Sequence, residues 1–194
     1  MIRYTHVKLV VDKLIALMIF PFFLLIFLLI LIPQLLLYKK VFFVQERPGK
    51  NSKVFSLMKF QTMKAGTEED EARITTFGNI LRKFAIDEIP QILNILKGEM
   101  SFIGPRPLLT EYLALYNKKH SRRHEVLPGI SGLAQIKGDV IFNLTDKLDY
   151  DVYYVDHVSF NLDLKIVLET IRILFVRAGK LKQIIAGKFR GYEV

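Results

Sequence analysis

The sequence has no cysteine and no tryptophan, and only four of its 194 residues are histidine. The absence of cysteine excludes disulfide scaffolds, thiolate zinc sites and cysteine nucleophiles. The histidines are scattered along the chain, so a histidine-rich metal centre is not expected; they are His6, His120, His124 and His157. Any metal ion would therefore be a hard cation held by oxygen ligands.

One long stretch of the chain lacks charge altogether. Residues 14–38 contain no Asp, Glu, Lys or Arg, and all of them except Pro21, Pro33 and Gln34 are hydrophobic. As a helix rising about 1.5 Å per residue, such a stretch is long enough for a hydrocarbon core of roughly 30 Å. It is too long for a cleavable signal peptide. The sequence thus divides into a membrane segment and a remainder that can form one compact domain.

Two features argue against a simple transmembrane helix. Pro21 lies inside the hydrophobic stretch, where it removes a backbone hydrogen bond and kinks or breaks a helix. Basic residues flank the stretch on both sides, whereas a spanning helix normally shows an asymmetry. These residues are Arg3, Lys8 and Lys13 before the stretch and Lys39, Lys40, Arg47 and Lys50 after it. A re-entrant helix that breaks at Pro21 and returns to the same face explains both features, and a kinked spanning helix is the alternative.

The rest of the chain predicts one helix-rich domain with a small β element. Residues 41–44 and 54–60 are β-prone and are separated by turn residues, which predicts a hairpin. Residues 127–132 are predicted as a rigid loop, and residues 118–123 form a basic cluster. The expected helices share apolar residues at helical spacing and cover residues 76–83, 87–97, 108–116 and 162–178. The last of these is amphipathic, so it either lies on a membrane surface or covers the core.

The adjacent carboxylates Asp87 and Glu88 are the first candidates for catalysis. As purely structural residues they would cap a helix whose first turn tolerates Pro90. The same position suits an ionised nucleophile near a phosphate, with a divalent ion held by the second carboxylate. Arg82 lies close by in sequence, and Arg106 stands between two prolines, a stiff setting that suits bidentate phosphate contacts. Further candidate cations are Lys59 and Arg47.

Two neighbouring motifs are highly specific. Asp-Glu-Ile-Pro-Gln occupies residues 87–91, and Gly-Glu-Met-Ser-Phe-Ile-Gly-Pro-Arg-Pro occupies residues 98–107. Weaker pieces lie at residues 45–49, 59–63, 77–82, 128–135, 150–154 and 162–165. Together with the Pro-interrupted hydrophobic helix, these motifs make nearly the whole chain similar to the bacterial sugar transferase family. The resemblance is to the monotopic polyprenyl-phosphate phosphoglycosyl transferases in their minimal form, which has only the catalytic domain.

The resemblance implies a transfer in two steps. Asp87 would attack the β-phosphorus of a UDP-sugar, expel UMP and form a phosphosugar–aspartyl intermediate. Undecaprenyl phosphate would then take the phosphosugar, which starts the assembly of a bacterial glycoconjugate. Glu88 would bind Mg²⁺ as the cofactor. The substrate-binding residues that the resemblance implies are Arg82, Arg106, Lys59, Arg47 and Tyr153.

The resemblance also implies a location and a set of partners. Residues 1–40 would be a re-entrant helix that docks the chain on the cytoplasmic face of the bacterial inner membrane, and residues 41–194 would be the cytoplasmic catalytic domain. The partners would be a UDP-sugar, undecaprenyl phosphate and membrane lipids. Nucleic acid is not expected, because the basic residues are dispersed and no recognition motif accompanies them. The sequence leaves open which sugar and which glycan pathway are served, and whether the chain forms a homo-oligomer.

Three departures from the family pattern concern recognition and membrane entry. Leu127 stands where Arg is common, Lys137-Gly138-Asp139 stands where Asn-Gly-Arg is common, and Phe20 replaces a frequent Ser before Pro21. The first two bear on substrate identity and the third on how sharply the helix breaks. A function from another class is also considered, namely a non-catalytic membrane-anchored module. In that case the net charge of +9 binds lipid or a partner, and the Asp-Glu pair only caps a helix.

Overall fold

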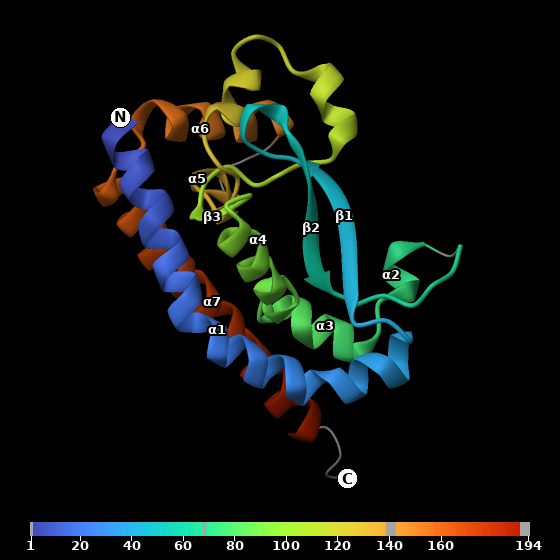
Figure 1. The fold of residues 1–194 in the computed structure, drawn as a ribbon. Coiled ribbons are helices and arrows are strands. Elements are labelled where there is room, and N and C mark those ends of the chain that lie inside the picture. Colours follow the sequence, from blue (N-terminus) through green and yellow to red (C-terminus); the bar gives the residue numbers. More distant parts are fainter. Residues whose placement is uncertain (1, 68, 139–142, 191–194) are drawn as a thin grey trace.

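The computed structural model describes residues 2–67, 69–138 and 143–190 and confirms a mostly helical α+β fold (Figure 1). The α-helices are α1 (Ile2–Tyr38), α2 (Asp70–Arg73), α3 (Thr76–Lys83), α4 (Ile92–Lys97), α5 (Leu133–Ile136), α6 (Leu144–His157) and α7 (Phe160–Arg190). The strands are β1 (Phe42–Pro48), β2 (Val54–Phe60), β3 (Ser101–Ile103) and β4 (Gly129–Ser131). The 3₁₀ helices are η1 (Lys50–Ser52), η2 (Ile86–Gln91), η3 (Thr110–Leu115) and η4 (His120–Glu125).

Strands β1 and β2 form the predicted hairpin. They pair antiparallel from Phe42 opposite Phe60 to Pro48 opposite Val54. Residues 45–48, expected as part of the turn, instead continue β1, because each has a partner in β2. The turn itself is short and contains Asn51, whose φ of 54° is the left-handed conformation that Asn tolerates.

The main hydrophobic core joins this hairpin to α4 and α1. Phe60 of β2 and Ile95 of α4 are buried, and so are Ala16 and Phe23 of α1. The ring of Phe23 stacks on that of Phe60 with centroids 6.4 Å apart. The inner face of α1 therefore completes the core of the domain.

The helix does not break at Pro21. Helix α1 runs from Ile2 to Tyr38 through both Pro21 and Pro33, and Figure 1 shows it as a curved helix with α3 and α4 on its concave side. A proline inside a helix removes one backbone hydrogen bond, and this loss can bend the helix without ending it. In place of the expected interruption at Pro21, α1 continues through this residue as one curved helix.

The outer face of α1 is apolar and exposed. Its side chains include Met18, which is 74% exposed, and Leu36, which is 79% exposed. Within the described part of the chain, α1 is the one helix that is long and apolar enough to cross a membrane. Such a large exposed apolar surface marks a membrane interaction site. The chain is therefore membrane-associated.

Helix α7 confirms the predicted amphipathic helix and extends it. Ile166 faces inward and is buried, so the helix covers a second, smaller core. Its outer face keeps exposed apolar residues at helical spacing, namely Phe160, Leu164, Leu168, Ile171 and Phe175. Of the two alternatives left open for this helix, the packing of Ile166 confirms that it covers a core, while the apolar outer face leaves contact with a membrane surface a prediction.

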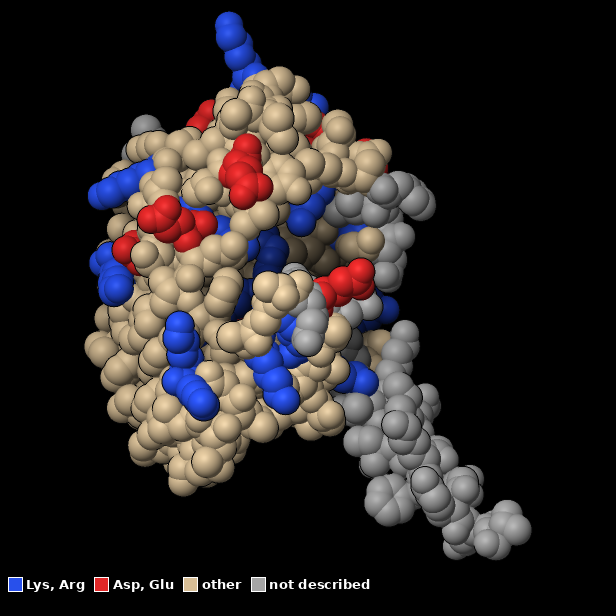
Figure 2. Space-filling view, turned by 90° about the vertical axis from the view of Figure 1, so that its right-hand side faces the viewer, with Lys and Arg blue, Asp and Glu red and all other residues tan. Residues whose placement is uncertain are grey.

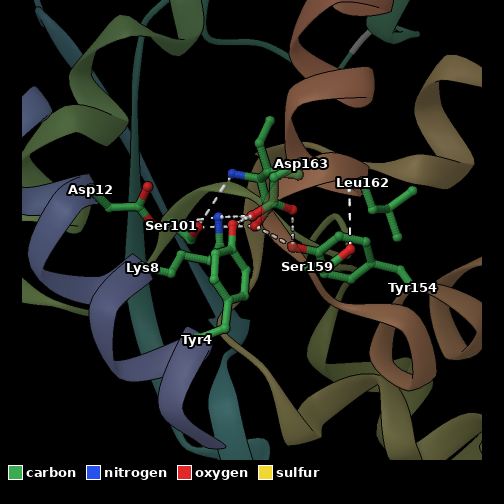
Figure 3. A network of polar contacts seen from close by, with 9 residues as sticks. Tyr4, Lys8, Asp12, Ser101, Tyr154, Ser159, Leu162 and Asp163 are labelled. Carbon is green, nitrogen blue, oxygen red and sulfur yellow. Dashed lines mark hydrogen bonds and ion pairs between the residues drawn. The ribbon is translucent and has the colours of Figure 1, made fainter. Parts of the chain in front are cut away.

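A buried polar network fastens the first turns of α1 to the start of α7 (Figure 3). Lys8 Nζ lies 2.7 Å from Asp163 Oδ2, and the hydroxyl of Tyr154 donates to Asp163 Oδ1 at 2.6 Å. The hydroxyl of Ser101 in β3 donates to Asp12 Oδ2 at 2.6 Å. Asp12, Ser101 and Asp163 are all buried, so the network fixes α1 against both β3 and α7.

The predicted loop at residues 127–132 contains a strand that sequence reasoning missed. Gly129–Ser131 pairs parallel with β3, with Ser101 opposite Gly129 and Ile103 opposite Ser131. The backbones here approach so closely that a Cβ on Gly129 would lie 2.1 Å from the amide nitrogen of Gly104. Two further segments differ from the expected helices. Residues 108–116 contain the 3₁₀ helix η3 in place of an α-helix. The helix expected at residues 87–97 begins as the 3₁₀ helix η2 and continues as α4.

Candidate active site

A cleft of about 960 Å³ lies between the β1–β2 hairpin, η2 and α7. Figure 2 shows Lys and Arg side chains within and around a hollow on this face of the molecule. Among the described residues that line the cleft, two are carboxylates, Asp87 and Glu88. Six are cations, namely Arg47, Lys59, Lys64, Arg73, Arg82 and Arg106. This excess of positive charge suits a ligand that carries several negative charges.

The two carboxylates lie in the first turn of η2. The N-cap of this helix is Ala85, in the left-handed conformation with a φ of 55°, so the alternative in which Asp87 caps the helix is wrong and Asp87 lies in its first turn. The sharp turn at Ala85 redirects the chain after α3 and brings η2 against β2. Asp87 is 7% exposed, and the described residues show no hydrogen bond to its side chain; Lys59, Glu88, Arg82 and Arg106 act on it through space. Its carboxylate is therefore available for chemistry.

Glu88 is braced by two cations. Its Oε1 lies 2.7 Å from Lys59 Nζ and 2.5 Å from Arg106 Nη2. Burial by itself would raise the pKa of Glu88, but the attraction and hydrogen bonds of Arg106 and Lys59 outweigh burial and lower that pKa below its ordinary value. Glu88 is consequently a firmly ionised carboxylate that holds the two cations in place.

For Asp87, the contributions that raise the pKa outweigh those that lower it. Burial raises the pKa of Asp87, and the neighbouring charge of Glu88 raises it further, while Lys59, Arg82 and Arg106 lower it without cancelling the rise. Two adjacent carboxylates with pKa values shifted in opposite directions are typical of a catalytic site, where each group has a separate role.

The predicted arginines lie around these carboxylates. Arg82 comes from α3, and its Nε donates to Thr62 Oγ1 at 2.9 Å. Arg47 comes from β1, where its Nη2 donates to Gln45 Oε1 at 2.6 Å. Within the described chain, Arg47 Nε is buried and has no hydrogen-bond partner. Burial lowers the pKa of Arg47, and the charge of Arg106 lowers it further, so an anion placed between these two arginines would be stabilised.

Tyr153 is the predicted site residue that the structure places elsewhere. It lies on α6, is 51% exposed, and stacks on His157 with ring centroids 4.0 Å apart. It lines a neighbouring cleft of about 800 Å³ that does not include Asp87. On α6 the next residue, Tyr154, points into the core, and this forces Tyr153 away from it.

Several residues of the cleft were missed at the level of sequence. Thr62 fixes Arg82, and its only sequence signal is its place in the Lys-Phe-Gln-Thr-Met motif at residues 59–63. One wall is apolar and comes from α7 through Ile173 and Leu174, which a helical pattern alone places in a core. The cleft is therefore lined by charged side chains together with apolar side chains from α7.

The donor set fits a magnesium ion that is bound mainly through its substrate. The described residues contain no group of three or more His, Cys, Asp or Glu side chains that could hold a metal alone. Mg²⁺, however, usually takes one or two protein carboxylates together with substrate phosphates and water. Glu88 would supply one such carboxylate once it releases Lys59 or Arg106, which both lie within hydrogen-bond distance of it.

These features define a class of protein. A buried carboxylate in a cationic cleft, in a chain with a long exposed apolar helix, fits a membrane-associated enzyme that handles phosphorylated substrates. The chain belongs to the bacterial sugar transferase family, which it matches over residues 3–177. It is therefore a sugar transferase, and the hypothesis of a non-catalytic anchored module is not supported.

Its relatives fall into two groups by length. An uncharacterized sugar transferase, EpsL, of Bacillus subtilis is 48% identical over 78% of this chain and 79% of its own length. The chain also matches UDP-N-acetylgalactosamine-undecaprenyl-phosphate N-acetylgalactosaminephosphotransferase of Aeromonas hydrophila, at 37% identity over 72% of the chain and 36% of that protein. UDP-glucose:undecaprenyl-phosphate glucose-1-phosphate transferase of Xanthomonas campestris is 37% identical over 69% of the chain and 31% of that protein. The chain thus spans about a third of the two longer relatives.

Proposed function

We propose that the chain transfers a phosphosugar from a UDP-sugar to undecaprenyl phosphate through a covalent intermediate on Asp87. The observation that carries the proposal is the position of Asp87, a buried carboxylate for which the described residues show no side-chain hydrogen bond, in a cleft lined by six cations among those residues. The names of the Aeromonas and Xanthomonas relatives each contain a UDP-sugar and undecaprenyl phosphate, although the sugars differ. The cleft supplies what a nucleotide diphosphate needs, because its charges are concentrated next to the nucleophile.

In the first step, an oxygen of ionised Asp87 attacks the β-phosphorus of the UDP-sugar. The bond between that phosphorus and the bridging oxygen breaks, and UMP leaves with the bridging oxygen. Arg82, Arg106 and Lys59 stabilise the negative charge that builds up on the phosphate oxygens. In the second step, a phosphate oxygen of undecaprenyl phosphate attacks the same phosphorus, and Asp87 leaves as a free carboxylate. The product is undecaprenyl diphosphate-sugar.

Glu88 has two roles in this scheme. It holds Lys59 and Arg106 at the edge of the cleft in the free enzyme, and these cations turn to the phosphates when the nucleotide binds. Glu88 is then released from one of its partners and is the residue that would hold Mg²⁺. The metal would neutralise phosphate charge and so help UMP to leave.

We further propose that the protein works at the cytoplasmic face of the bacterial inner membrane. UDP-sugars are water-soluble, whereas undecaprenyl phosphate stays in the bilayer, so the cleft must face water next to the lipid. The apolar outer faces of α1 and α7 suit this position. Relatives named as exopolysaccharide production proteins make surface polysaccharide assembly the pathway to test first.

An activity assay with purified protein tests the reaction. Protein in detergent is given Mg²⁺, undecaprenyl phosphate and a panel of UDP-sugars, and UMP release is measured. We expect release with at least one sugar and its loss in Asp87→Asn. The matched control is Asp149→Asn, a carboxylate in the neighbouring cleft that pairs with Lys119, and this variant should keep its activity.

The covalent step has a test of its own. Without undecaprenyl phosphate, the wild type should release at most one UMP per enzyme molecule and gain the mass of one phosphosugar on the peptide that contains Asp87. Release that depends strictly on the acceptor, with no mass gain, would show direct transfer and remove Asp87 as the nucleophile. Loss of activity with EDTA that is restored by Mg²⁺ would support the assigned metal.

A further inference from the structure

Arg123 is a buried cation in what the sequence presents as a basic cluster. It lies in η4, and its side chain is 1% exposed, whereas that of its neighbour Arg122 is 41% exposed. Removing a guanidinium from water is costly unless its donors find acceptors. The acceptors around Arg123 therefore indicate what the residue is for.

These acceptors come from three different parts of the chain. Arg123 Nε and Nη2 donate to Asp151 Oδ2 of α6 at 3.0 and 2.6 Å. Arg123 Nη1 donates to the hydroxyl of Tyr116 at 3.2 Å. Arg123 Nη2 also donates to the backbone carbonyl of Arg106 at 2.6 Å. The guanidinium thus joins a buried carboxylate on α6 to the main chain of a residue that lines the cleft.

The bond to Arg106 is the one that reaches the active site. Pro105 and Pro107 already restrict the backbone on either side of Arg106. The carbonyl held by Arg123 fixes the peptide plane between them, and with it the direction in which the Arg106 side chain leaves the backbone. That side chain meets Glu88 at 2.5 Å. One continuous series of contacts thus runs from Asp151 through Arg123 and Arg106 to Glu88.

We propose that Arg123 is a positioning residue that sets Arg106 for the phosphates of the nucleotide sugar, and that Asp151 holds Arg123 in place. The proposal rests on the proposed function, because it assigns Arg106 to the substrate. Arg123 does not touch the substrate itself. Its effect passes through the backbone of Arg106, since a displacement of about 1 Å at a substrate-binding group can cost a hundredfold in rate.

A purely structural role for Arg123 makes a different prediction. If Arg123 only ties η4 to α6, its loss should harm the enzyme whether or not Arg106 is present. If it acts through Arg106, its loss should matter only while Arg106 is there to be positioned. A double-mutant cycle separates the two roles, because residues that act as one unit are non-additive.

The cycle uses Arg123→Met, Arg106→Met and the double variant, with Arg122→Met as the matched control. Arg122 is next in sequence but pairs at the surface with Glu125 and Asp156. Three quantities are measured for each protein, namely kcat and KM for the UDP-sugar and the Kd of UDP. We expect Arg123→Met to lower kcat/KM about 10- to 100-fold, mostly through KM. The double variant should be no worse than Arg106→Met, Arg123→Lys should recover part of the loss, and Arg122→Met should match the wild type.

Each outcome decides the proposal. Additive losses in the double variant, or a folded Arg123→Met with wild-type kinetics and UDP affinity, would overturn it. If Arg123→Met fails to fold by circular dichroism and gel filtration, the same cycle is run with Arg123→Lys. If the wild type turns over no UDP-sugar, the proposed function fails, and the cycle in UDP affinity still tests whether Arg123 acts through Arg106.

Discussion

Replacing Glu88 by Gln removes the negative charge that Lys59 and Arg106 share. Breaking a buried ion pair by removing one partner costs about 3–5 kcal/mol, because the other charge is left buried and unpaired. Here the side chains of Lys59 and Arg106 are 19% and 34% exposed, so water relieves part of that cost. We therefore expect Glu88→Gln to lower the free energy of unfolding by about 2–3 kcal/mol.

This loss is large enough for a thermal melt. For a domain of this size, 1 kcal/mol corresponds to a shift of about 2–4 °C, so Tm should fall by roughly 4–12 °C at pH 7. The melt is followed by circular dichroism in detergent, since the chain has no tryptophan for fluorescence. Glu125→Gln, which breaks only the exposed pair with Arg122, is the control and should leave Tm unchanged.

The pH dependence gives the same prediction a second test. The folded-state pKa of Glu88 lies below its unfolded value, so its stabilisation is complete above the unfolded pKa of about 4.3. That stabilisation is lost as pH falls through the folded pKa. The difference in Tm between wild type and Glu88→Gln should therefore be full at pH 7 and shrink below about pH 4. Equal Tm values at pH 7 would refute the view that Glu88 braces the two cations.

Three further changes test other parts of the structure. Phe23→Ala should lower stability by about 3–5 kcal/mol, seen as a fall in Tm, because Phe23 is buried against Phe60. Tyr153→Ala should leave KM for the UDP-sugar unchanged, since Tyr153 lines the neighbouring cleft. A large rise in KM would show that Tyr153 belongs to the active site. Because burial raises the pKa of Asp87 while Arg82 lowers it, Arg82→Met should move the acid limb of the kcat/KM profile to higher pH.

The elements that sequence predicted are those with a local pattern. Apolar periodicity predicted α3 and α7, and turn residues between β-prone runs predicted the hairpin. Strands β3 and β4 have three residues each and pair in parallel across a long connection, so neither shows alternation that a local reading could detect. The backbone contact between Gly104 and Gly129 depends on the same pairing.

In the candidate site, too, the residues that could be predicted are those with a local sequence signal. Asp87, Glu88, Arg82 and Arg106 could be predicted because specific motifs mark them, and the structure brings them to one cleft. The burial of Arg123 could not be predicted from the sequence. Its neighbours in sequence are charged, and its partners come from α6 and from the backbone of Arg106. Motif membership alone also does not show that Tyr153 lines the neighbouring cleft, because adjacent residues on a helix point in different directions.

The packing of α1 favours a helix whose two ends stay on one side of the membrane. Near its start, Asp12 accepts a hydrogen bond from Ser101, and at its end the hydroxyl of Tyr38 donates to the carbonyl of Thr62. Between these points, Phe23 packs in the core of the domain. A helix that is fastened to the same polar domain near both ends cannot cross a bilayer without drawing that domain into hydrocarbon, where unpaired polar groups are costly.

Cysteine accessibility tests this argument directly, because the chain has no cysteine of its own. Single cysteines replace Arg3 and Lys40, which flank the apolar part of α1, and a membrane-impermeant maleimide is applied to intact cells and to inverted membrane vesicles. We expect both positions to react only in the inverted vesicles, where the cytoplasmic face is outside. Labelling of one position in intact cells and of the other in vesicles would mean that α1 crosses the membrane. Its contacts with Ser101 and Thr62 could then not both exist in the membrane-bound protein.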